Sequence, residues 1–121
     1  MIRTDCYLAI MARMKRQFPD ARFEEVYKAS GSVLAPSANI LVATGIFKKP
    51  DGTKNPTDFV LYRRLFREHI LSDPRAVAWL RKLKEMAISR DVFLVCLEKD
   101  ATNCHRTLLK EMMDELNDGS S

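Results

Sequence analysis

The sequence lacks several features that would identify a class of protein at once. No apolar run approaches the roughly 20 residues that a membrane helix needs, and Asp5 and Arg13 bound a first apolar run that is too short for a secretory signal. Three cysteines cannot all pair, and their spacing is not that of a disulfide framework. The chain contains neither a glycine-rich phosphate loop nor a dinucleotide fingerprint. We therefore expect a cytoplasmic protein with reduced thiols, no membrane association and no cofactor.

The composition that is present is that of a small soluble domain. The chain has 121 residues, of which 46% are hydrophobic and 30% are charged, enough for one core and too few for two. The net charge of +4 permits an anionic partner without requiring one. We expect a single domain over residues 1–117, followed by a frayed tail at 118–121.

Apolar spacing gives a mixed prediction for the first half of the chain. The dense apolar run at 6–13 predicts a buried strand, with a short helix as the alternative. Residues 21–30 place three apolar side chains at helical spacing and end before Gly31, so they predict a helix. Residues 39–47 fit either a helix that starts behind a proline and a serine or, from their β-branched content, a strand; we prefer the helix. Residues 48–58 predict an exposed loop.

The second half of the chain is more regular. Residues 58–71 and 72–87 each carry an apolar stripe beside basic residues, and both predict helices that pack on a core. Residues 91–98 form a continuous apolar run bounded by charges, which is typical of a strand covered on both faces. Residues 102–117 predict a further amphipathic helix, with Thr102 or Asn103 able to cap its start.

These elements predict an α/β fold: one domain, with a small and mostly parallel sheet flanked by helices. The last strand and helix form a Rossmann-like corner, in which a short loop leads from the strand directly into the helix. In open α/β sheets, ligand sites lie at the carboxyl ends of the strands, where the next helix offers unpaired N–H groups.

Four chemically versatile side chains fall within nine residues at this corner: Glu98, Cys104, His105 and Arg106. The helix dipole and the neighbouring basic groups favour the thiolate form of Cys104. At about 100° per residue, the helical projection predicts that His105 faces the sheet and that Arg106 points away from it, towards the rim.

Each of these residues also has a purely structural interpretation. Cys104 fits a small packed residue as well as it fits a reactive thiol. Taken alone, His105 is better explained as a satisfied buried imidazole, and Arg106 as a solvated surface residue. Cys96 lies inside the apolar strand and is predicted to pack in the core. The cysteines and the histidine lack the paired spacing of zinc ligands, so no metal site is predicted.

The corner also carries a resemblance. The segment VFLVCLEKDATNCHRTLLKEMM resembles the carboxyl-terminal signature of the family called domain of unknown function 488 (DUF488), a Leu-Cys-x-Glu strand followed by Cys-His-Arg at the start of a helix. LAPSANIL resembles the family's Ala-Pro-Ser-x-x-Leu segment, and the helix pair between them is also similar, so that residues 34–116 are covered. Arg13 matches an arginine that follows the family's first strand, whereas the Pro-Arg-Gly that comes next in the family is missing here.

The resemblance implies a compact α/β protein and a site, but no reaction. In it, Glu98, Cys104, His105 and Arg106 match the signature position by position. The family as a class has no assigned activity. Function must therefore be inferred from the residues themselves.

Three hypotheses of function follow, of which we rank the first highest. The first is a site for an anionic small molecule, such as a nucleotide or a phosphorylated metabolite, in which Glu98, Cys104 and His105 act as catalytic groups and Arg13, Asn103 and Arg106 bind the anion. The second is binding of nucleic acid by the basic helices at 58–90. The third is a structural corner, in which Glu98 and Arg106 bridge the strand to the helix above His105.

Overall fold

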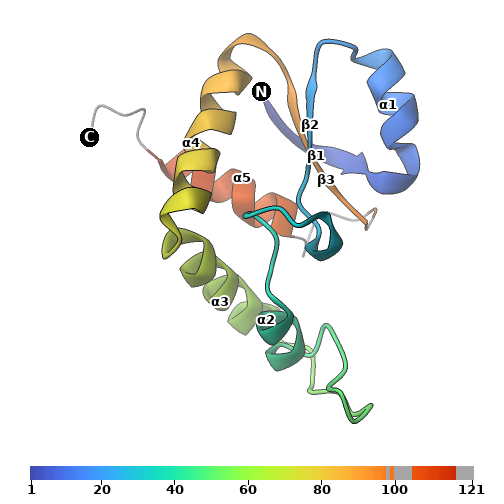
Figure 1. Cartoon of the computed structure of the whole chain (residues 1–121), viewed down its shortest axis with the longest axis vertical. Coiled ribbons are helices and arrows are strands. Elements are labelled where there is room, and N and C mark those ends of the chain that lie inside the picture. Colours follow the sequence, from blue (N-terminus) through green and yellow to red (C-terminus); the bar gives the residue numbers. More distant parts are fainter. Residues whose placement is uncertain (98, 100–104, 117–121) are drawn as a thin grey trace.

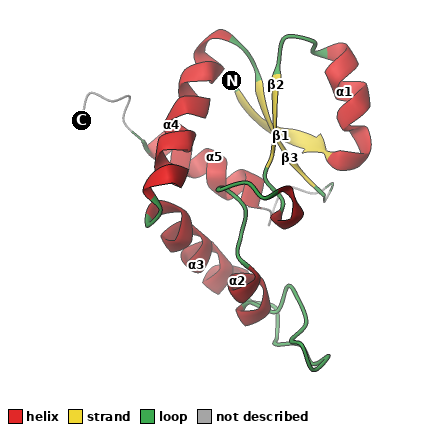
Figure 2. Ribbon diagram, in the orientation of Figure 1, coloured by secondary structure: helices red, strands yellow, loops and turns green. Residues whose placement is uncertain are grey.

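Three parallel strands form the centre of the computed structural model, which describes residues 1–97, 99 and 105–116 (Figure 2). They are β1 (Ile2–Tyr7), β2 (Arg22–Glu25) and β3 (Val92–Cys96), and their order in the sheet is β1-β3-β2. All five residues of the central strand β3 are buried. The α/β class and the buried strand predicted within 91–98 are confirmed.

Helices cover both faces of this sheet (Figure 1). On one face, α3 (Phe59–Leu71), α4 (Pro74–Ser89) and α5 (His105–Glu115) enclose the main hydrophobic core. On the other face, α1 (Met11–Gln17) covers a smaller cluster that contains Cys6, Met14, Phe93 and Val95. Within the part of the chain that the structure describes, no helix combines the length and the apolar character that a membrane crossing requires.

The structure corrects the strand predicted at 6–13. β1 begins at Ile2 and ends at Tyr7, and the rest of the apolar run forms a 3-10 turn (Leu8–Ile10) and then α1. The reason is that, within the described residues, β1 is an edge strand whose one partner is β3, and its pairing register shifts between Arg3 and Cys6. Such a strand needs no continuous apolar run. The residues of the 3-10 turn and α1 are more apolar than those of β1, so the apolar run pointed to the wrong segment.

The helix predicted at 21–30 is also wrong. This segment forms β2 and a 3-10 turn (Lys28–Ser30), which ends at Gly31 with a φ of 73°. The N–H of Val26 donates to the carbonyl oxygen of Val95 (2.9 Å), and the ring of Phe23 stacks on Phe93 with centroids 4.9 Å apart. The segment is therefore extended because it pairs with β3, some 70 residues away in sequence, although its apolar residues have helical spacing.

The remaining helices and the exposed loop agree with the sequence. The helix preferred at 39–47 is present but shorter: α2 spans Ala38–Ala43, and residues 44–47 form a turn. The N–H of Ile40 donates to the hydroxyl oxygen of Ser37 at its start (3.3 Å). Asp58 and Asp73 cap α3 and α4 by accepting backbone N–H bonds of 2.9 and 3.0 Å. The predicted cap of α5 and the tail at 118–121 lie outside the described residues.

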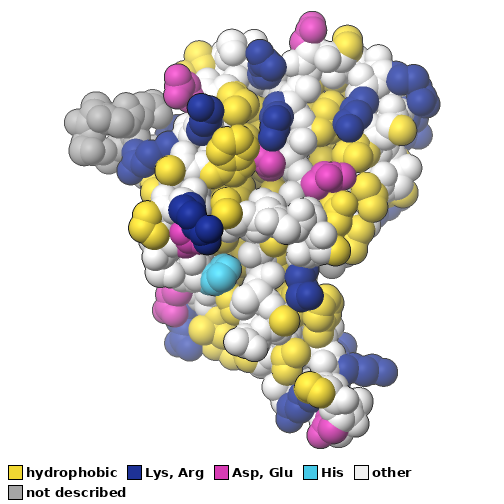
Figure 3. Space-filling model, in the orientation of Figure 1, with side chains coloured by type: hydrophobic (Ala, Val, Ile, Leu, Met, Phe, Trp, Pro, Cys, Tyr) yellow, Lys and Arg dark blue, Asp and Glu magenta, His cyan; other side chains and the backbone are white. Residues whose placement is uncertain are grey.

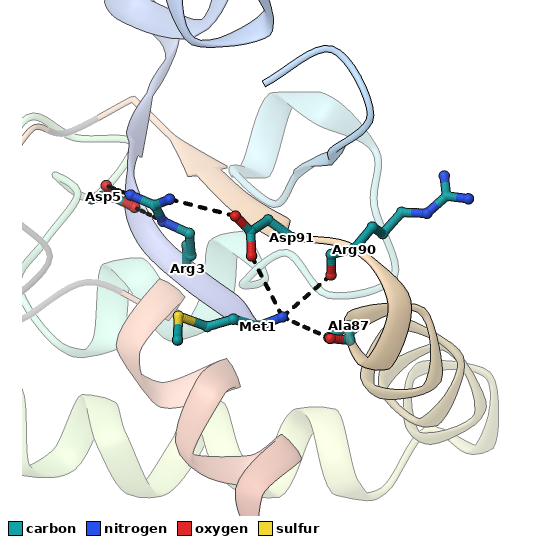
Figure 4. A network of polar contacts seen from close by, with 6 residues as sticks. All are labelled: Met1, Arg3, Asp5, Ala87, Arg90 and Asp91. Carbon is teal, nitrogen blue, oxygen red and sulfur yellow. Dashed lines mark hydrogen bonds and ion pairs between the residues drawn. The ribbon is translucent and has the colours of Figure 1, made fainter. Parts of the chain in front are cut away.

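A polar network joins the start of β1 to the turn between α4 and β3 (Figure 4). The Met1 nitrogen donates to the carbonyl oxygens of Ala87 (2.7 Å) and Arg90 (3.2 Å). The guanidinium of Arg3 pairs with Asp5 (2.8 Å) and with Asp91 (3.5 Å). These contacts lie at the surface, so each adds little to the stability of the fold.

The chain between α2 and α3 folds back closely on the end of α2. The N–H of Asp58 donates to the carbonyl oxygen of Thr44 (3.0 Å), and the Asn55 side-chain amide donates to the carbonyl of Val42 (3.1 Å). Gly45 has a φ of 73°, and a Cβ at this position would lie 2.3 Å from the backbone oxygen of Asn55. Only glycine fits both the left-handed conformation and this close backbone approach.

We therefore expect Gly45→Ala to lower the free energy of unfolding by about 3 kcal/mol, from the left-handed conformation and the backbone clash together. Gly31→Ala is the matched control, because Gly31 has the same φ of 73° with nothing within 4 Å of the added carbon. It should cost only about 1–2 kcal/mol. Urea denaturation of the two variants measures the difference, and equal losses would contradict the close approach at Gly45.

Candidate functional site

The first residue of α5 points into the protein. His105 is only 6% exposed, and its Nε2 lies 2.6 Å from the carbonyl oxygen of Val26, just beyond the end of β2. Because a carbonyl oxygen can only accept, Nε2 carries the proton of this hydrogen bond. The ring of His105 also meets the edge of Phe66, with centroids 5.7 Å apart. The inward direction agrees with the helical projection.

The second residue of α5 departs from the prediction. Arg106 was expected at the rim, but it is 0% exposed, and its guanidinium donates to the carbonyl oxygens of Cys6 (2.5 Å) and Lys99 (3.4 Å). The buried face of α5 is wider than a single stripe, since Met113, on the same side of the helix as Arg106, is also fully buried. A side chain at the edge of such a face is enclosed rather than solvated.

Together, the two side chains connect α5 to both edge strands. His105 binds the backbone just after β2, and Arg106 binds the backbone of β1. These strands flank β3 on opposite sides. The first turn of α5 is therefore held beneath the carboxyl ends of the whole sheet.

A cavity of about 600 Å³, which we call the His105 cavity, opens at this end of the sheet. Cys96 and His105 lie on the side of the sheet, and Tyr27 and Lys28 come from the chain that follows β2. The opposite wall consists of residues of α2, α3 and the loop between them, including Leu41, Phe47, Lys54, Thr57, Phe59 and Tyr62. None of the described lining residues is acidic.

The polar side chains that line the His105 cavity, among the described residues, are three hydroxyl groups, a thiol, an imidazole and two ammonium groups. Burial, followed by the negative charge of Glu25 and a hydrogen bond to it, raises the pKa of the Tyr27 hydroxyl. That hydroxyl therefore keeps its proton at neutral pH. Lys28 and Lys54 are exposed, so their ammonium groups are hydrated and charged at the rim.

The structure brings together only part of the predicted site. His105 lines the cavity, whereas Arg106 lies against the backbone of β1. Arg13 is exposed on α1, not on a strand, and it is not among the described residues that line the cavity. Glu98, Asn103 and Cys104 lie outside the described residues. Among the residues that are described, no group of three His, Cys, Asp or Glu side chains is placed to hold a metal ion.

Sequence reasoning missed several residues of the cavity. Cys96 was assigned to the core, and it is 3% exposed, but its side chain also lines the cavity. Its place in the Leu-Cys-x-Glu signature was the one available signal. Tyr27, Lys28 and Lys54 gave no signal, because long-range folding alone brings their segments to the end of β3.

The basic helices α3 and α4 present a mixed surface. Arg63 pairs with Glu111 of α5 (2.9 Å), and Arg67 pairs with Glu115. On the face seen in Figure 3, Lys and Arg side chains are scattered among acidic and hydrophobic ones. Cations that are paired with carboxylates or dispersed over a surface attract a nucleic-acid backbone less than a continuous basic patch does. Binding of nucleic acid by residues 58–90 stays a prediction.

Comparison with known proteins identifies the family. The family model DUF488-N3a, described as the active DUF488-N3 subclade, matches residues 5–117. The match includes α1 and β2, where the resemblance seen in the sequence was weaker. Searches among curated proteins and among solved structures find no match.

Because Arg106 is buried and bonded to the backbone, we expect Arg106→Ala to lower the free energy of unfolding by about 3 kcal/mol or more, through unpaired carbonyl groups and lost packing. Arg13→Ala removes an exposed arginine and should change the free energy of unfolding by no more than about 0.5 kcal/mol. Urea denaturation of both variants is the measurement. Equal midpoints for the two would show that Arg106 does not hold α5 to β1.

Proposed function

The chain belongs to the DUF488 family, and from this premise we propose that the His105 cavity is its functional site and binds a small anionic molecule with a flat ring, such as a nucleotide. The observation that supports this most is the composition of the wall. It combines two lysines, a histidine and aromatic side chains with no acidic residue among those described. The description of the matched subclade as active agrees with a site that carries out a reaction.

The charges of the cavity favour an anion. Lys28 and Lys54 come from separate segments, one after β2 and one before α3, and both reach the same opening. The attraction between a lysine and an anionic ligand is strongest where part of the water around the ligand is displaced, as it is in a cavity of this size. A phosphate or carboxylate group at the rim would meet both ammonium groups.

The apolar part of the wall favours a ring. Phe47 and Phe59 line the cavity and are 44% and 40% exposed, so their rings are open to a ligand that enters it. Aromatic faces stack on any flat ring. The hydroxyl protons of Tyr27 and Thr57 go to Glu25 and to the Gly45 carbonyl, so their oxygens can accept from donors at the edge of that ring.

His105 supplies the group that can move a proton. Its ring is held by the bond from Nε2 to the Val26 carbonyl, and it faces the same space as the lysines. A fixed imidazole beside a bound ligand is the arrangement that general acid–base catalysis requires. We include in the proposal a cytoplasmic location, which the thiols of Cys6 and Cys96, neither of them part of a disulfide, support.

Three probes separate the two parts of the ligand: adenosine monophosphate, adenosine and inorganic phosphate. We expect the monophosphate to bind most tightly, because it alone joins a ring to an anion. Lys28→Gln and Lys54→Gln should each raise its Kd about fivefold, equivalent to about 1 kcal/mol for one charge. Isothermal titration calorimetry gives each Kd.

Lys82→Gln is the matched control, since Lys82 is exposed on α4 and does not line the cavity. This variant should bind the monophosphate as the parent chain does. Equal affinities for adenosine and its monophosphate, or no binding of any of the three probes, would contradict the proposal.

A further inference from the structure

A thiol and an imidazole meet inside the His105 cavity. The Sγ of Cys96 lies 3.7 Å from Nε2 and 4.0 Å from Nδ1 of His105, and both residues line the cavity. Cys96 is the last residue of β3, and His105 is the first residue of α5. The contact therefore spans the predicted strand-to-helix corner, but with a different cysteine from the one that the sequence favoured.

The hydrogen bond from His105 to Val26 determines which ring nitrogen can accept a proton from the thiol. It fixes one proton on Nε2, so in the neutral ring Nδ1 is the basic nitrogen. A nucleophile, a base beside it and a third group that orients the base form the arrangement by which proteins activate thiols and hydroxyls. Here the three are the Cys96 thiol, the His105 ring and the Val26 carbonyl.

We propose that Cys96 is a nucleophilic thiol that His105 activates, acting on small anionic compounds that carry an electrophilic carbon. This proposal rests on the proposed function, because it assigns a reaction to the same cavity. The proton of Sγ passes to Nδ1 of His105, and the sulfur electron pair forms a bond to the electrophilic carbon. The bond from that carbon to its leaving group breaks, and the leaving group departs with the electron pair.

The lysines at the rim complete the site. Lys28 and Lys54 line the same cavity as Cys96, so an anion held by them would place the rest of a small molecule towards the thiol. The volume of about 600 Å³ is enough for a ligand of nucleotide size at this end of the sheet. Positioning by remote charges is a main source of rate in reactions between bound groups.

Cys6 provides an internal reference. It is also buried, at 0% exposure, but it packs in the small cluster with Met14 and Phe93 and is not among the described residues of the cavity. Burial and the charge of Asp5 raise the pKa of the Cys6 thiol. Cys6 should therefore react only when the fold opens.

The test uses iodoacetamide, which is small enough to enter the cavity and transfers its carbon to sulfur with loss of iodide. The chain is prepared as Cys104→Ser, so that Cys6 and Cys96 are the two thiols present. Mass spectrometry of the digested protein gives the alkylation rate at each thiol. We expect Cys96 in the folded protein to react at least about tenfold faster than Cys6.

A second pair of variants tests the role of the imidazole. In the same background, His105→Gln should slow the alkylation of Cys96 about tenfold, whereas His69→Gln, which removes the other histidine, should leave it unchanged. The rate at Cys6 shows whether either substitution opens the fold. If His105→Gln does open the fold, the test depends on the parent protein alone, through the ratio of the alkylation rate of Cys96 to that of Cys6.

Two results would overturn the proposal: a Cys96 in the parent that reacts no faster than Cys6, or a Cys96 rate that His105→Gln leaves unchanged while Cys6 stays slow. The labelling needs no bound nucleotide, so the two proposals fail separately. Slow labelling of Cys96 with tight binding of the monophosphate removes only the thiol proposal. Fast labelling without such binding removes only the proposed ligand class.

Discussion

The bonds that hold the first turn of α5 beneath the sheet are the constraint on which the rest of the structure depends. Arg106 donates to the backbone of β1, and His105 donates to the backbone just after β2. A buried guanidinium costs several kcal/mol unless its hydrogen bonds are made, so the helix cannot shift without losing them. Since β3 lies between these two strands, the position of α5 is fixed relative to all three.

This constraint joins two interpretations that the sequence left as alternatives. The bond from His105 to the Val26 carbonyl is structural, because it ties α5 to the chain after β2. The same bond sets the proton on the ring and turns the ring towards Cys96 and the cavity. A corner that holds the fold can therefore also orient a reactive group, and the cavity forms where the sheet ends and the chain between α2 and α3 folds over it.

The elements with strong local patterns could be predicted, and those defined by distant pairing could not. β3, α3, α4 and α5 carry continuous or periodic apolar residues, and the sequence places all four. β1 and β2 are short edge strands whose conformation depends on hydrogen bonds to β3, so spacing within each segment was misleading. Arg106 was misplaced because the projection assumed a narrow buried stripe, whereas α5 is enclosed on two sides. The family came from the signature, and the inward direction of His105 came from the helical projection. Lys28 and Lys54 could come only from the folded chain.

The tautomer of His105 tests the central constraint most directly. Long-range proton–nitrogen correlation spectra of the nitrogen-15-labelled chain distinguish a ring nitrogen that carries a proton from one that does not. We expect a proton fixed on Nε2 of His105 at about pH 8, where a free histidine exchanges between both neutral forms. His69 in the same spectrum serves as the reference for an imidazole outside the cavity. A neutral His105 with its proton on Nδ1, or with the same averaged signals as His69, would contradict the bond to Val26 and the orientation of the site that depends on it.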